Sequence, residues 1–106
     1  MNFFDKKAKI LDIAMNLNRI GNWAADGYGA RERRIKIFLD ETGRLVNSLQ
    51  PESFSLPFKK TLGKFLNEYK LLEKEGRDKP KDALLWAEGM MTWGNILTHR
   101  VRLIKP

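Results

Sequence analysis

The sequence contains no cysteine and a single histidine, His99. Without cysteine, disulfide scaffolds, thiol catalysis and Cys-based zinc sites are excluded. One histidine cannot build a multi-histidine metal site, and the Glu-x-x-His pairs that di-iron helical bundles use are absent. We therefore expect a protein that is not an enzyme and that needs no metal or other cofactor.

Long hydrophobic runs are also missing. The longest apolar stretch, residues 84–97, contains Glu88 and Asn95 and is too short to span a bilayer. The first residues, MNFFDKKAKILDIA, carry Asp5 and three lysines where a signal peptide would have an uninterrupted apolar run. We expect a cytoplasmic protein that does not associate with membranes.

No segment shows the two-residue alternation of a β-strand, whereas apolar residues recur at helical spacing almost everywhere. Ile10, Ile13, Leu17 and Ile20 are one example of such a stripe. The pattern predicts helices over residues 3–25, 30–49, 56–75 and 80–104. Because short connections make sequential helices antiparallel, we expect one all-α domain, residues 1–106, folded as an up-down-up-down antiparallel four-helix bundle with short loops.

The segment AADGYGARERR, residues 24–34, predicts a corner between the first two helices. Gly27 can adopt a conformation with positive φ that closes a helix, and Gly29 frees the backbone again. Neither the Walker spacing with Lys-Ser/Thr nor three spaced glycines after a strand is present. The glycines are therefore interpreted as a turn and not as a phosphate-binding loop.

The corner does not explain Arg31, Arg33 and Arg34, which crowd a helix start where the helix dipole disfavours cations. In one interpretation they are solvated or bridge acidic residues across the corner, namely Asp26, Glu73 or Glu75. In the other they form an anion-binding corner together with the aromatic residues Trp23 and Tyr28. The sequence leaves both interpretations open.

The formal net charge is +7, from 20 basic and 13 acidic residues. In the expected topology this excess gathers at the end that bears both termini. Ten cations lie there against Asp5, Asp12 and Glu52: Lys6, Lys7, Lys9, Arg44, Lys59, Lys60, Lys64, Arg100, Arg102 and Lys105. Such a field would steer a polyanion, so electrostatic nucleic-acid binding is one functional hypothesis. In the other interpretation these residues are a solvated face and partners of the helix dipole.

The helix expected over residues 80–104 is apolar around most of its circumference. Its heptad stripe contains small residues, Ala83, Ala87 and Gly94, and so predicts a close approach by a neighbouring helix. Trp86, Met90 and Trp93 form an adjoining stripe. Either this helix is wrapped by the other three, or part of it contacts a partner, because Trp and Met are enriched at interfaces.

The second alternative gives the leading hypothesis for function. We expect a small non-catalytic interaction or adaptor protein, a subunit of an assembly or a homodimer. The residues expected at its interface are Leu85, Trp86, Trp93 and Ile96. The nucleic-acid hypothesis remains beside it, with Lys6, Lys7, Lys9, Lys59, Lys60, Arg100, Arg102, Arg31, Arg33 and Arg34 as the candidate contacts.

Overall fold

The computed structural model describes residues 2–105, and in that range the chain is 86% helical with no strand. Its α-helices are α1 (Phe3–Asn47), α2 (Phe58–Arg77) and α3 (Ala83–Arg100). Two short 3₁₀ helices, η1 (Pro51–Ser53) and η2 (Val101–Leu103), follow α1 and α3. The all-α expectation is confirmed. The structure has three α-helices in this range where the sequence pattern predicts four, because the first two expected helices are joined in α1.

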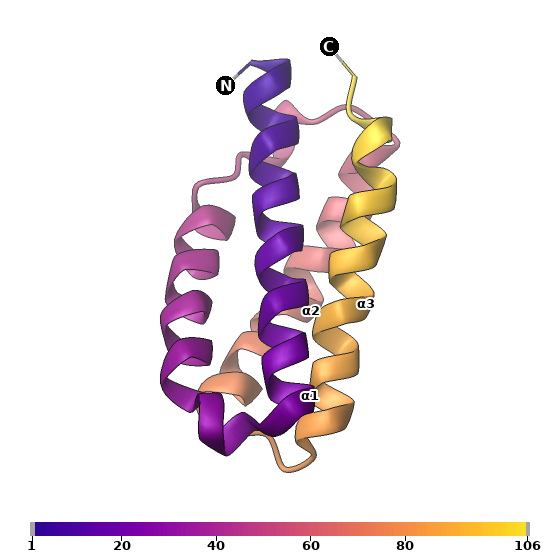
Figure 1. Ribbon diagram of the computed structural model, residues 1–106. Coiled ribbons are helices and arrows are strands. Elements are labelled where there is room, and N and C mark those ends of the chain that lie inside the picture. Colours follow the sequence, from indigo (N-terminus) through magenta and orange to yellow (C-terminus); the bar gives the residue numbers. More distant parts are fainter. Residues whose placement is uncertain (1, 106) are drawn as a thin grey trace.

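The long helix α1 folds back on itself at Gly27. Its backbone there has φ 151° and ψ 96°, outside the helical region and in a range that favours glycine. We call residues 3–26 the first arm and residues 28–47 the second arm; they run side by side in opposite directions (Figure 1). The predicted corner is confirmed at Gly27, whereas Gly29 lies inside the helical second arm.

The remaining helices complete an elongated molecule whose principal extents are 42 × 20 × 18 Å. The first arm lies between the second arm and α3, and α2 runs behind them (Figure 1). Both chain ends lie at one end of the molecule, together with the connection between α1 and α2. We call this the terminal end. The opposite end, the corner end, holds Gly27 and the loop between α2 and α3.

Side-chain caps fix two of the helix starts. Asn2 caps α1 by accepting a hydrogen bond from the Asp5 backbone N–H at 2.8 Å. Helix α3 begins later than expected, because Asp82 caps it by accepting from the Leu85 N–H at 3.0 Å. Asp78 and Lys79, which precede Pro80, lie in the preceding loop.

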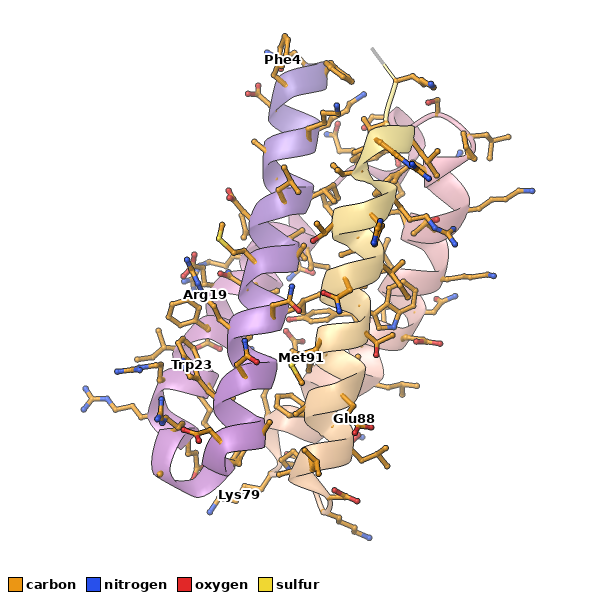
Figure 2. All side chains as sticks on the ribbon, turned by 45° about the vertical axis from the view of Figure 1, so that its right-hand side comes forward. Phe4, Arg19, Trp23, Lys79, Glu88 and Met91 are labelled. Carbon is orange, nitrogen blue, oxygen red and sulfur yellow. The ribbon has the colours of Figure 1, made fainter. Side chains whose placement is uncertain are left out.

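The core forms where the helical stripes meet, and the first arm and α3 approach each other closely there. A Cβ atom added at Gly94 would lie 2.6 Å from the Asn18 Oδ1, and one added at Gly21 would overlap the Met91 side chain. Figure 2 shows Met91 between these two helices. The close approach that the small residues of the last helix predicted is thus present.

Gly76 lies beyond the end predicted for its helix, residue 75, but inside α2. Helix α2 continues one residue beyond it, to Arg77. The Trp86 ring packs directly on Gly76, so closely that a Cβ atom would overlap the ring. The Gly76 carbonyl also accepts a hydrogen bond from the buried Tyr28 hydroxyl. Gly76 therefore permits packing between α2, α3 and the second arm instead of ending a helix.

Candidate functional site

The fold brings seven of the predicted cations to the terminal end. Three come from the first two turns of α1, two from the start of α2, and two from the end of α3 and η2, all at the end where Figure 1 shows both termini. They are Lys6, Lys7, Lys9, Lys59, Lys60, Arg100 and Arg102. The grouping expected from the topology is therefore present, although the residues belong to elements far apart in sequence.

Several of these cations are held by neutral groups. The Lys6 ammonium donates to the Ser53 carbonyl at 2.6 Å, and the Lys9 ammonium donates to the Ser48 hydroxyl at 2.8 Å. Arg100 donates to the Thr61 hydroxyl at 3.1 Å and so ties α3 to α2. These contacts orient the cations and leave their charge uncompensated.

Ion pairing is confined to the other part of the molecule. Among residues 2–105, every ion pair joins groups of the corner, the second arm, the second half of α2 or the loop after α2: Arg31–Asp26, Lys36–Glu32, Lys79–Glu32, Arg77–Asp40 and Arg77–Glu73. Hydrogen bonding to Lys36 lowers the pKa of Glu32, and the same contact raises the pKa of Lys36. The corner end thus compensates much of its own charge, whereas none of the seven terminal cations has a carboxylate partner in the described part of the chain.

The three corner arginines behave differently from one another. Arg31 pairs with Asp26 at 2.7 Å, which is one of the bridges expected for it. The Arg34 guanidinium carbon lies 5.2 Å from the centroid of the Trp23 ring, in a cation–π contact. Arg33 is exposed and makes neither an ion pair nor a side-chain hydrogen bond to any residue in the range 2–105.

The aromatic half of the expected anion-binding corner needs a correction. Tyr28 is buried and packs edge-on against Trp86, with ring centroids 6.1 Å apart. Its hydroxyl donates a hydrogen bond to the Gly76 carbonyl. It therefore cannot meet a ligand from solvent. Trp23 remains half-buried beside the arginines, on the side of the first arm toward the second arm (Figure 2).

A groove lies beside these arginines on the outer face of the second arm. Its volume is about 780 Å³, and it is lined by Ala30, Arg31, Arg33, Arg34, Ile37 and Phe38. Phe38 is half-buried, and Ile37 keeps 53% of its surface exposed. The sequence pattern identified the arginines but not the apolar floor. Ile37 lies outside the inward stripe of its helix, and this position indicates an exposed apolar side chain.

The interface expected on α3 is wrong for both tryptophans. Trp86 and Trp93 are only 2% and 8% exposed and belong to the core. Their indole N–H groups donate to the Leu72 carbonyl at 2.9 Å and to the Glu68 carboxylate at 2.5 Å. The apolar circumference of α3 arises mainly because α1 and α2 both pack on it.

Of the other two expected interface residues, Leu85 is 64% exposed and Ile96 is half-buried against the core. Two further leucines that sequence reasoning missed are also exposed, Leu84 in the first turn of α3 and Leu71 in α2. All three leucines lie toward the corner end. Leu71 and Leu84 both fall outside the inward stripes of their helices, which is the sequence signal for them.

Metal clusters and membrane-spanning helices are both absent from the described residues. Within residues 2–105, no group of three or more His, Asp or Glu side chains is placed to hold a metal ion. In the same range no helix combines the length and apolarity that crossing a membrane requires. In comparison with known proteins, the chain matches no family model, no curated protein sequence and no solved structure.

Proposed function

We propose that the protein binds nucleic acid electrostatically through its terminal end. The observation that carries this proposal is the segregation of charge: the terminal cations lack carboxylate partners, whereas the ion pairs gather elsewhere. An unpaired cation cluster attracts phosphates and releases their counterions on binding, and this release supplies most of the affinity of non-specific complexes. The cations already paired with acids would contribute less, because binding would first have to break those pairs.

We also propose that the two arms of α1 count as two helices, so that the molecule is an up-down-up-down four-helix bundle. That topology explains why the first turns of α1, the start of α2 and the end of α3 meet at one end. The tethers from Lys6, Lys9 and Arg100 to neutral partners support it further. They reduce the rotamer freedom that these long side chains would lose on contacting a phosphate.

The test is the binding of a labelled mixed-sequence DNA duplex followed by anisotropy at about 50 and 200 mM salt, a range in which multi-phosphate contacts weaken steeply. We expect the double variant Lys59→Glu/Lys60→Glu to bind at least about tenfold more weakly, with a salt slope that is smaller by about 2. Both lysines are exposed, so the fold should be unaffected.

The matched control is Lys70→Glu/Lys74→Glu, which makes the same charge change on exposed residues nearer the other end of α2. It should lose much less affinity. Equal losses in the two variants would show that net charge alone attracts the duplex. An absence of binding at the lower salt concentration would contradict the proposal.

A second candidate function is self-association as a homodimeric interaction protein. The observation that favours it is the exposure of three leucines in the parts of α2 and α3 nearest the loop at the corner end, with Leu71 71%, Leu84 58% and Leu85 64% exposed. We propose that a second copy of the chain covers them. These leucines replace the tryptophan surface expected from the sequence, and they lie away from the terminal end, so both functions are compatible.

A further inference from the structure

The groove on the second arm combines charge with an apolar floor. Ala30, Arg33, Arg34 and Ile37 follow the i, i+3, i+4, i+7 spacing that places side chains on one face of a helix. Ile37, which is 53% exposed, lines the groove together with three arginines. The groove therefore offers an anion two kinds of contact, guanidinium groups and an apolar surface.

Arg34 is positioned for stacking. Its guanidinium lies over the Trp23 ring, and Trp23 is itself braced edge-on by Phe38, with ring centroids 4.9 Å apart and an interplanar angle of 84°. Trp23 thus holds Arg34 in place at the groove that Arg34 lines. A planar ligand can stack on a guanidinium held in this way, as unpaired nucleobases do on arginine in RNA-binding proteins.

The charges of the groove are suited to a phosphate. Arg33 has no partner within residues 2–105, and Arg31 is anchored by Asp26 at 2.7 Å. An anion entering beside Arg33 would therefore meet a free guanidinium, whereas the charge of Arg31 is already compensated by Asp26. Arginine also binds phosphate oxygens through two parallel N–H groups.

We propose that this groove binds nucleotides of a single-stranded nucleic acid, with a base against Arg34 and the Ile37–Phe38 floor and a phosphate on Arg33. A duplex does not fit this role, because its bases are paired and stacked within the helix. The inference rests on the proposed nucleic-acid function and adds a preference for single strands to it. The terminal end holds the backbone by charge, and the groove holds unpaired bases.

The chain carries its own reporter for this groove. Trp86 and Trp93 are buried in the core, so Trp23 is the one tryptophan of the chain that stands beside the groove with part of its surface open. A base that stacks on Arg34 would change the surroundings of Trp23 and quench its fluorescence. The variant Trp23→Phe should abolish that signal and so assigns it.

The test compares the binding of a mixed-sequence single strand with that of the duplex of the same sequence. The strand has about 20 nucleotides because, at a rise of about 3.4 Å per nucleotide, a stacked strand of this length exceeds the 42 Å length of the molecule. We expect the single strand to quench Trp23 and to bind about tenfold more tightly than the duplex. The variant Arg34→Lys keeps the charge but loses the planar guanidinium. It should abolish the preference and leave duplex affinity unchanged.

The outcomes separate the two proposals. Equal binding of both forms without quenching would overturn the groove inference and leave the terminal end as the binding surface. Quenching of Trp23 by a polyglutamate peptide as strong as that by the strand would also overturn it, in favour of an acidic peptide. If neither nucleic acid binds at about 50 mM salt, where phosphate contacts are strong, both proposals fail.

Discussion

At the scale of single residues, Tyr69 shows how burial and a neighbouring charge act together. Its hydroxyl donates to the Glu73 carboxylate at 3.3 Å, and Glu73 in turn contacts Arg77, which binds Asp40 of the second arm at 2.6 Å. Burial, and then the negative charge of Glu73, raise the pKa of Tyr69 above its ordinary value of 10.0. The neutral phenol is thus part of the contact between α2 and the second arm.

This raised pKa predicts a loss of stability in alkali. As pH rises above about 10, the unfolded chain releases the Tyr69 proton while the folded chain keeps it, so the free energy of unfolding falls by up to about 1.4 kcal/mol per pH unit. Urea unfolding of Tyr69→Phe should show a shallower decline than wild type above about pH 10, where tyrosine ionises. Curves that run parallel would refute this role for Tyr69.

The tryptophans show why residue roles were harder to predict than helices. The apolar stripes of α3 indicated that Trp86 and Trp93 are either core or interface residues. Periodicity cannot choose between these roles, because it does not say how many neighbours pack on a helix. The choice depends on Gly76, which makes room for the Trp86 ring, and on Glu68, which accepts the Trp93 N–H across the contact with α2.

At the scale of elements, the reversal of α1 depends on one residue. A side chain at φ 151°, ψ 96° is strained even where space is available, and nothing lies within 4 Å of a Cβ atom at Gly27. The sequence predicted this corner correctly, because glycine is the residue type that such a backbone requires. The predicted helices, 3–25 and 30–49, left residues 26–29 as a turn, whereas in the structure Gly27 alone departs from helical geometry.

Gly27 and Gly29 provide a matched pair for testing the reversal. Gly27→Ala should lower the free energy of unfolding by about 1–3 kcal/mol, the usual strain of such a backbone. Gly29→Ala places the same methyl group in open space within a helix and should raise it by up to about 1 kcal/mol. Chemical denaturation measures both changes, and equal effects of the two substitutions would refute the assignment of strain to Gly27.

At the scale of the whole molecule, the topology predicted from short connections placed the terminal cations together. The groove was only half predictable: its arginines stand out in the sequence, whereas its floor depends on how the second arm turns against Trp23. The exposed Leu71 and Leu84 were missed for a related reason. A sequence pattern identifies the inward face of each helix but not which outward residues of different helices share an end of the molecule.

Association of two copies is also a property of the whole molecule. Leu85→Glu places a charge among the exposed leucines and should shift the protein from dimer to monomer. Sedimentation at about 10 and 100 µM measures this, because association depends on concentration by mass action. The control Asn95→Glu changes charge at another exposed position of α3 and should leave the sedimentation unchanged. A wild-type protein that is monomeric at both concentrations would overturn the homodimer.

Ion-paired groups lie toward the corner end, and cations without carboxylate partners lie at the terminal end. This separation along the 42 Å axis gives the protein a permanent electric dipole. Near a uniformly negative surface, a molecule of this kind rotates before contact and arrives with its positive pole first. Adsorption would then be end-on, with the Gly27 bend facing away from the surface. If a nucleic-acid strand were held at the positive pole, the groove near the opposite pole would therefore stay free to bind the unpaired bases of that strand.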